Sequence, residues 1–125
     1  MSEKKVLVVS EDESLRKKII EFLTIVSTDY IGFGVSTMAT IDEQLTQNGP
    51  FTVLITEYKF KKFNGFEVID KITKNDKNTL IIIIPERTQI QEIQQQLPKH
   101  PVHDVLCKPL NMKYLQQVIV MGLKK

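Results

Sequence analysis

The sequence predicts an α/β fold in which helices cover both faces of one parallel sheet. Short apolar runs rich in β-branched residues alternate five times with segments of helical periodicity. This order favours parallel strands joined by right-handed crossovers. The run at residues 80–84, LIIII, is apolar at every position, which is typical of a strand buried on both faces. A chain of 125 residues suits one core, so we expect a single domain over residues 1–125.

Five segments have the composition of strands. They are expected at residues 4–9, 29–36, 53–55, 80–84 and 102–107. The second of these segments alternates only loosely between apolar and polar residues and contains two glycines. That pattern places it near the edge of the sheet.

Between the strands, apolar residues recur with the spacing of one helix face. Helices are expected at residues 15–26, 40–48, 65–75, 88–97 and from 112 onward. Residues 40–43 match a capping box and predict the start of the second helix, which Asn48-Gly49-Pro50 ends. The last helix begins after the capping residue Asn111. Its core-facing residues are expected to be Leu115, Val118, Ile119 and Met121.

The composition is that of an ordinary globular protein and excludes several classes. The apolar fraction is 42% and the charged fraction 26%. No apolar run approaches the roughly 20 residues that cross a bilayer, so we expect no membrane partner. The net charge of +2 is too small to argue for nucleic acid. The lone Cys107 cannot form an internal disulfide, and we expect a cytoplasmic protein.

One acid, Glu57, lies where the third strand ends. In an open parallel sheet, ligands and chemistry collect at the carboxyl ends of the strands. Glu57 is therefore the first candidate for a functional residue. The basic loop behind it, residues 59–63, carries three lysines and two phenylalanines and is the next candidate.

Three motifs together resemble the receiver domain of two-component response regulators. They are the acidic end of the first strand (VLVVSEDESLR), the third strand with its loop (LITEYKFKKFNG) and Lys-Pro after the fifth strand (DVLCKPL). Their order and spacing cover the whole chain. The resemblance implies a flavodoxin-like (βα)5 fold with the strand order 2-1-3-4-5. It also implies a signalling protein that is not an enzyme and whose partner is a histidine kinase or a downstream effector.

In that family a histidine kinase transfers a phosphoryl group to an aspartate at the end of the third strand. Acids after the first strand hold Mg²⁺, and a lysine after the fifth strand and a hydroxyl after the fourth bind the phosphoryl oxygens. The resemblance assigns the acceptor position to Glu57 and the acid pair to Ser10 and Glu11, with Asp12 next to them. One acid is thus missing, and the acceptor has the wrong length.

The other positions also depart from the family pattern. The hydroxyl position falls on Pro85. The next position, where the family usually has a small residue, is Glu86. The aromatic residue on the fifth strand, which moves in the family's switch, falls on Val105. Lys108 alone keeps its type. Proline has no hydroxyl and no N–H, and valine has no aromatic ring. Both residues that move in the family's switch are therefore missing.

These departures predict a pseudo-receiver that binds partners without being phosphorylated. The longer glutamate displaces its carboxylate by about 1 Å, which can cost roughly a hundredfold in rate. We expect no resident cofactor and weak or no Mg²⁺ binding; any site for the ion would use Glu11 and Glu57, or Asp12 after a register shift. Lys108 is expected to pair permanently with Glu57. The predicted partner surface comprises Ile90, Ile93, Tyr114 and Gln117.

Three alternatives remain open on the sequence alone. The chain is a receiver that a histidine kinase still phosphorylates, a flavodoxin-like cofactor binder, or a nucleic-acid binder that uses the loop at residues 59–63. The acidic turn at residues 10–13 would repel a flavin phosphate, which disfavours the second. The third predicts affinity that falls steeply with salt.

Overall fold

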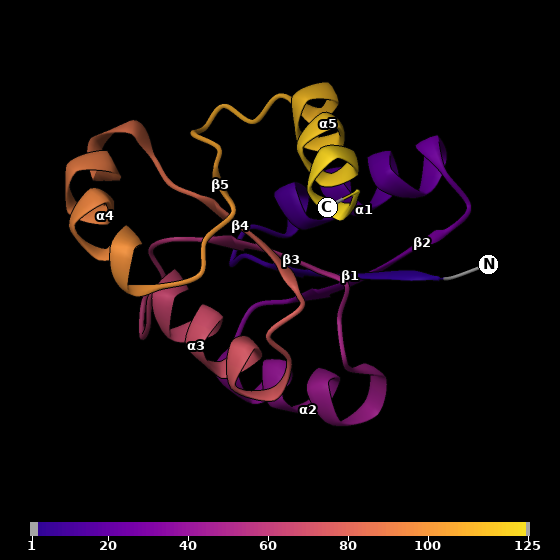
Figure 1. The fold of residues 1–125 in the computed structure, drawn as a ribbon, viewed down its shortest axis with the longest axis horizontal. Coiled ribbons are helices and arrows are strands. Elements are labelled where there is room, and N and C mark those ends of the chain that lie inside the picture. The colour runs from indigo at the N-terminus through magenta and orange to yellow at the C-terminus, as the bar shows by residue number, and fades with distance from the viewer. Residues whose placement is uncertain (1–2, 125) are drawn as a thin grey trace.

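A computed structural model describes residues 3–124 of the chain. Five strands form one parallel sheet in the order β2-β1-β3-β4-β5, which confirms the predicted order (Figure 1). The strands are β1 (Lys4–Val9), β2 (Tyr30–Val35), β3 (Val53–Glu57), β4 (Leu80–Ile84) and β5 (Asp104–Val105). The strand β2 lies at one edge of the sheet, as its two glycines and loose alternation predicted.

Five α-helices connect the strands and lie on both faces of the sheet. They are α1 (Glu13–Val26), α2 (Met38–Asn48), α3 (Gly65–Asn75), α4 (Ile90–Gln96) and α5 (Met112–Leu123). Buried residues of α1 and α5 share one apolar cluster, while those of α2, α3 and α4 share the other. The fold is therefore a flavodoxin-like three-layer (βα)5 arrangement, as predicted.

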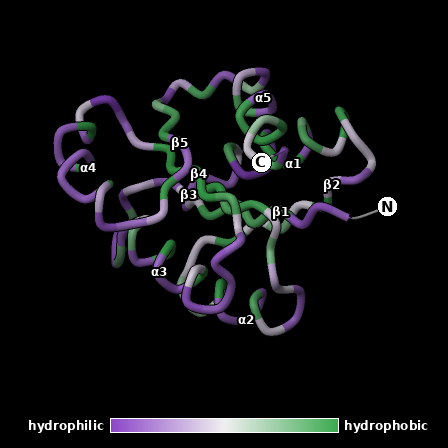
Figure 2. Tube along the Cα trace, viewed as in Figure 1, coloured by the Kyte–Doolittle hydropathy of each residue, from purple (hydrophilic) through white to green (hydrophobic). Residues whose placement is uncertain are grey.

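The alternation of side chains along β4 divides its residues between the two cores. Ile81 and Ile83 belong to the cluster under α2, α3 and α4. Leu80, Ile82 and Ile84 belong to the cluster under α1 and α5. Both faces of the strand are thus covered, which explains why the sequence is apolar at every position. Figure 2 shows the same result as a hydrophobic centre and hydrophilic outer segments.

The predicted start of the second helix is wrong by a few residues. The capping box consists of Thr37 and Thr40, because the Thr37 hydroxyl accepts the N–H of Thr40 at 3.1 Å and the Thr40 hydroxyl accepts the N–H of Thr37 at 3.1 Å. Thr40 is the closing residue of the box and lies inside α2, which begins at Met38.

The fifth strand is shorter than the predicted residues 102–107. At its start the N–H of His103 donates to the carbonyl of Ile81 at 2.9 Å, but the N–H of Ile81 donates to a side-chain atom, Nδ1 of His103, at 2.9 Å. Next along the strand, the N–H of Val105 donates to Oδ1 of Asp104 at 2.9 Å. Only Asp104 and Val105 are in register with residues of β4. A short edge strand with an occupied N–H is a poor template for pairing with another chain.

The prediction that Met121 faces the core is wrong, because 61% of the residue is exposed. Its neighbour Gly122 makes the close contact with the sheet instead. A Cβ at Gly122 would lie 2.7 Å from Cδ1 of Leu80, so only glycine allows α5 to approach so closely. Leu115 and Ile119 are buried as predicted.

The segment around α4 is attached to the rest of the domain at both of its ends. Single turns of 3-10 helix, Arg87–Gln89 and Leu97–Lys99, flank α4. The hydroxyl of Tyr58 donates to Glu92 near the start of α4. After its end, Nδ1 of His100 lies 2.9 Å from Oδ1 of Asp70 on α3.

None of the helices in the described part of the chain has the length and apolar character of a membrane span.

Candidate functional site

The candidate site lies at the carboxyl edge of the sheet, where the loops after four strands meet. The residues there are Ser10 after β1, Glu57 at the end of β3, Pro85 and Glu86 after β4, and Lys108 after β5. The parallel topology brings them together from positions that are far apart in the sequence. Four of the five touch one another through side-chain contacts.

The carboxylate of Glu57 uses both of its oxygens within this group. Oε1 forms an ion pair with Nζ of Lys108. Oε2 accepts a hydrogen bond from the hydroxyl of Ser10, which is itself buried. The side chain of Glu57 is only 13% exposed. The predicted Glu57–Lys108 contact is therefore present in the structure, and Ser10 adds a second partner.

Lys108 binds a second carboxylate at the rim of the site. Its Nζ lies 3.1 Å from Oε2 of Glu86, and its side chain is 26% exposed. Burial by itself lowers the pKa of Lys108, but the hydrogen bonds and negative charges of Glu57 and Glu86 outweigh burial and raise the pKa above its usual value of 10.5. The ammonium is thus held in its charged form between two acids. The backbone N–H of Lys108 also donates to the carbonyl of Pro85 at 3.0 Å.

The acids after β1 have tasks outside this group. Oε2 of the exposed Glu11 accepts the backbone N–H of Lys61 at 3.2 Å. Oδ1 of Asp12 accepts the N–H of Leu15 at 3.2 Å and so caps α1. Within residues 3–124, no three His, Cys, Asp or Glu residues are arranged as a possible metal site. Glu11 thus binds the loop after β3, whereas Glu57 binds Lys108 and Ser10.

The two switch positions carry no polar side-chain group. Pro85 is buried directly after β4. Val105 is half-buried in β5 and packs against the cluster under α2, α3 and α4. Neither residue offers a hydroxyl or an aromatic ring that another residue could reposition.

Sequence reasoning missed two residues of the site. Nη1 of Arg16 donates to the carbonyl of Ser10 at 2.7 Å and adds a second cation beside the loop after β1. Its position, one helical turn after the capping residue Asp12, was the only available signal. Glu86 was recognised as a departure from the family pattern, but its role as a partner of Lys108 was not predicted.

Only some residues of the predicted partner surface are exposed. Tyr114 is 51% exposed and Gln117 is exposed, while Ile90 is half-buried. Ile93 is 0% exposed and belongs to the core. Its inclusion was wrong, because the narrow apolar side of α4 faces the sheet.

The phenylalanines of the loop at residues 59–63 contact each other. The rings of Phe60 and Phe63 stack with centroids 4.3 Å apart, and Phe60 is buried. Phe60 therefore has no free ring face to offer a nucleotide base, whereas Lys61 and Lys62 are exposed. This arrangement gives no support to the nucleic-acid alternative.

Comparisons with known proteins agree with the fold. The chain resembles solved structures of a receiver domain protein from Clostridium thermocellum (20% identity, 97% of this chain and 94% of that chain, TM-score 0.84) and of an adenylate cyclase from Rhodopirellula baltica (20% identity, 98% and 88%, TM-score 0.85). It also resembles the response regulator DrrB of Thermotoga maritima (19% identity, TM-score 0.79). That match covers 98% of this chain and 53% of the DrrB chain.

These identities support the fold alone, and a comparison with curated protein sequences gives no match. The model of the response regulator receiver domain family, however, matches residues 6–120. That match covers nearly all of the chain and includes every residue of the site described above. The chain therefore belongs to the receiver domains of two-component response regulators, which are signalling modules that work with histidine kinases and effectors.

Proposed function

We propose that this receiver domain is a protein-interaction module that works without phosphorylation. The observation that carries the proposal is that the site's polar groups are engaged with one another. Lys108 is held by Glu57 and Glu86, and the second oxygen of Glu57 is held by Ser10. A phosphoryl group arriving at Glu57 would have to break these contacts first.

The charge of the group also opposes phosphoryl transfer. Glu57 and Glu86 are acids, and Lys108 neutralises only one of them. Phosphoryl transfer depends on positioning and on neutralising the negative charge that the phosphoryl oxygens carry. A site with an excess carboxylate at its rim repels a phosphodonor where a working site would attract it.

Receiver domains typically bind Mg²⁺ at the phosphorylation site, but the residues present here do not fit the ion. Mg²⁺ needs oxygen ligands in near-octahedral order, usually from one or two carboxylates with water and phosphate. Ser10 replaces one acid and directs its hydroxyl hydrogen to Glu57. Glu11 instead accepts a backbone N–H of the loop after β3. The proposed function therefore includes no metal step.

The usual readout of phosphorylation is also missing. Coupling between a site and a distant surface needs an element with two arrangements. Pro85 and Val105 replace the hydroxyl and the aromatic residue that would supply them. We infer that the surface which partners recognise is constitutive, and that the protein meets its partners in the cytoplasm.

Intact-protein mass spectrometry after incubation with acetyl phosphate and Mg²⁺ tests the proposal. We expect no phosphoryl mass gain for the wild type. The matched control is the triple variant Ser10→Asp, Glu57→Asp, Pro85→Thr, which restores the residue types that the family resemblance implies. A gain in the control alone attributes the loss to these positions, whereas a gain on Glu57 of the wild type rejects the proposal.

The second candidate is a receiver that a histidine kinase still phosphorylates. The specific observation in its favour is Lys108, which keeps the family's residue type at the correct edge of the sheet. The same measurement with a histidine kinase as donor separates the two candidates. A flavodoxin-like cofactor binder has weaker support, and the absence of flavin absorbance in the purified protein would exclude a bound flavin.

A further inference from the structure

The strand β2 ends the sheet on one side and pairs only with β1 (Figure 1). The carbonyl of Asp29 accepts the N–H of Lys4 at 2.7 Å, and the carbonyl of Val35 accepts the N–H of Ser10 at 3.1 Å. Asp29 and Val35 therefore direct their backbone groups toward β1. The opposite side of β2, its outer edge, has no neighbouring strand.

Two glycines direct their backbone groups to this outer edge. Successive residues of a strand point their N–H and C=O groups to opposite sides, so those of Gly32 and Gly34 face away from β1. Within residues 3–124, no backbone or side-chain group hydrogen-bonds to these N–H and C=O groups. Gly34 is exposed and Gly32 is half-buried. Both residues thus offer a donor and an acceptor to another chain.

The outer edge lacks the features that usually protect an edge strand. Natural proteins block such edges with charged side chains, prolines, bulges or very short strands. The strand β2 has six residues, YIGFGV, and none of them is charged or a proline. At the opposite edge of the sheet, β5 has two residues, and the N–H of Val105 is bound to Asp104. The edge at β2 is therefore the better template for an added strand.

The helix α1 decides what kind of chain can occupy this edge. A Cβ at Gly32 would lie 2.7 Å from Cγ2 of Ile20, so α1 packs directly on the edge strand. Antiparallel pairing with a second copy would place another α1 over the adjacent strand, about 4.8 Å away. Packed helices need about 8–10 Å between their axes. A second copy is therefore disfavoured, whereas a single extended segment brings no helix with it.

A cation without an acidic partner lies beside the outer edge. A Cβ at Gly34 would lie 3.3 Å from Cδ and 3.4 Å from Nε of Arg16. One nitrogen of this side chain, Nη1, donates to the carbonyl of Ser10 at 2.7 Å. Arg16 forms no ion pair within residues 3–124. Since a guanidinium group has five N–H donors, Arg16 can also bind a carboxylate of an added strand.

The acids close to Arg16 in the sequence are engaged elsewhere. Asp12 caps α1 by accepting the N–H of Leu15. Glu13 pairs with Lys17 at 3.6 Å. The charge at this end of the outer edge is thus positive, which favours an acidic side chain on the added strand.

The other face of β2 is apolar. Phe33 packs against the cluster under α2, α3 and α4, and Ile31, two residues earlier, lies on the same face. Both residues are half-buried. Cross-strand pairs of β-branched or aromatic side chains stabilise neighbouring strands. An added strand is therefore expected to carry β-branched residues on this face, with a small residue near Ile20 on the opposite one.

We propose that the outer edge of β2 binds an extended segment of a partner protein as a sixth strand. The segment pairs with the backbone of Gly32 and Gly34, carries β-branched residues on the α2 face and places an acidic residue beside Arg16. In this mode of recognition the main-chain hydrogen bonds supply affinity and the alternate side chains supply specificity. The proposal rests on the proposed function, since it names the kind of partner that an unphosphorylated module would bind.

An NMR titration of the ¹⁵N-labelled full chain tests this inference. The probe is a blocked peptide in which valines alternate with alanine and aspartate, so that the valines lie on one face. At a peptide concentration about ten times the Kd, solvent exchange of the Gly32 and Gly34 amides should slow by about tenfold. The amides of Ile31 and Phe33 face β1 and serve as the internal control, because they are protected with or without the peptide.

Two altered peptides separate the backbone from the side-chain contribution. A peptide with the same side chains but N-methylated amides on its pairing side cannot donate to the edge, and we expect it not to bind. A peptide with lysine in place of aspartate keeps the backbone donors but meets Arg16 with a like charge. It should bind about threefold more weakly or worse.

A pair of variants at one residue locates the contact. Gly34→Pro removes the outward N–H, which has no partner in the fold, and should weaken binding of the probe by about tenfold. Gly34→Ala is the matched control, because it also adds a Cβ beside Arg16 but keeps the N–H, and its binding should stay within about twofold of the wild type. Unaltered NMR spectra outside β2 and its neighbours would show that both variants remain folded.

Several results would overturn the inference. They are equal binding of the N-methylated and unmodified peptides, equal binding of the lysine and aspartate peptides, shifts that map away from β2, no shifts at all, or equal weakening by the two variants. Concentration-dependent dimerisation that Gly34→Pro abolishes would replace the partner segment by a second copy. If the probe binds only after treatment with acetyl phosphate and Mg²⁺, the binding edge stands and the proposed function fails.

Discussion

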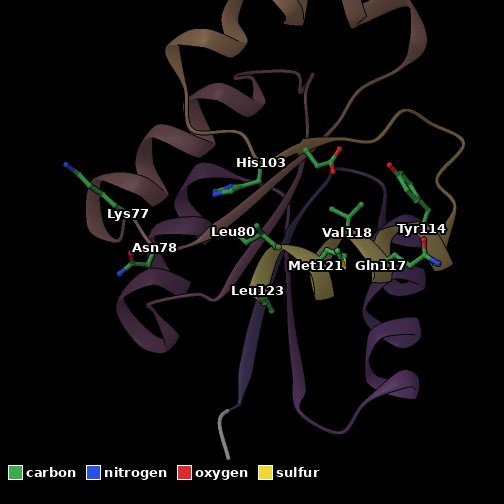
Figure 3. A pocket seen from close by; sticks show the side chains of 11 residues that line it. Lys77, Asn78, Leu80, His103, Tyr114, Gln117, Val118, Met121 and Leu123 are labelled. Carbon is green, nitrogen blue, oxygen red and sulfur yellow. The ribbon is translucent and has the colours of Figure 1, made fainter. Parts of the chain in front are cut away.

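The carboxyl edge of the sheet differs in its charged residues from the groove beside α5, which Lys77, Leu80, His103, Asp104, Tyr114 and Met121 help to line (Figure 3). At the edge, Lys108 is paired with Glu57 and Glu86 inside the domain. In the groove, Lys77 forms no ion pair within residues 3–124. The charges of the edge are therefore engaged with one another, whereas the lysine of the groove has no acidic partner among the described residues.

This difference indicates where function should be sought in a receiver with an altered site. Removing one partner of a charge pair inside the fold leaves the other charge buried and uncompensated, which destabilises the fold. A charge without an internal partner contributes little to stability and remains available. Substitutions of the paired charges at the edge should therefore change unfolding, whereas removal of the charge of Lys77 should not.

The largest effect is expected for Lys108→Met. It leaves Glu57 and Glu86 without a cation in a partly buried site, which should lower the free energy of unfolding by about 3 kcal/mol. Urea unfolding at neutral pH measures this change. The double variant Glu57→Gln, Lys108→Met removes both charges of the pair and should recover most of the loss.

The pH dependence of the same pair has a definite sign. The pKa of Lys108 is raised in the fold, so its stabilisation is complete below the usual value of 10.5 and is lost as the pH rises through the folded value. Lys108→Met should therefore lack this part of the alkaline loss of stability. Equal alkaline losses in the wild type and the variant would contradict a paired Lys108.

The second effect concerns His103, which lines the groove beside α5. His103→Ala removes the acceptor of the Ile81 N–H, and Ile81 is buried. A buried donor without a partner costs about 1–3 kcal/mol. Asn78→Ala is a suitable control, because it also shortens a side chain of the groove lining but leaves this hydrogen bond intact. Equal unfolding midpoints in urea for the two variants would show that the His103 contact is not structural.

A third, smaller effect is expected for Tyr58→Phe, which removes the hydroxyl that donates to Glu92 on α4. One hydrogen bond to a charged group contributes about 1.5–3 kcal/mol when well formed, and the exposure of Glu92 places this one at the lower end. Burial, followed by the hydrogen bond and the charge of Glu92, raises the pKa of Tyr58 to about 12.

The sign of the corresponding pH effect can be stated. Between the usual pKa of 10.0 and about 12, the unfolded chain loses the Tyr58 proton while the folded chain keeps it, so stability falls as the pH rises. A titration followed by tyrosinate absorbance should show one of the three tyrosines ionising near pH 12, and Tyr58→Phe should abolish that step. An unchanged titration curve would reject the contact.

Much of the fold could be predicted because the relevant signals are local. The run at residues 80–84 is typical of a strand covered on both faces, and the alternation of strands and helices predicts a parallel sheet. Glu57 and Lys108 were expected to meet because both follow strands of that sheet. Here the topology alone brings distant residues together.

The errors arose where the outcome depends on a contact that the sequence does not show. Met121 follows the helical spacing of a core residue, but the close approach of Gly122 to Leu80 turns it outward. The last strand has the composition of a longer one, yet the side chain of His103 accepts the N–H of Ile81 and the side chain of Asp104 accepts the N–H of Val105. Glu86 had no visible partner, because its ion pair depends on the path of the loop after β4.

The smallest effect on unfolding is expected for Glu86→Gln. Glu86 shares Lys108 with Glu57, but its side chain is mostly exposed, and exposed ion pairs contribute about 0.2–1 kcal/mol. Glu57→Gln removes the buried partner of the same ammonium and should cost several times more. Comparing the two variants in urea at low and high salt separates the rim from the interior, because salt screens only the exposed pair strongly. If Glu86→Gln cost as much as Glu57→Gln, the closed group at the sheet edge would be centred on the loop after β4, and Glu57 would be free for other chemistry.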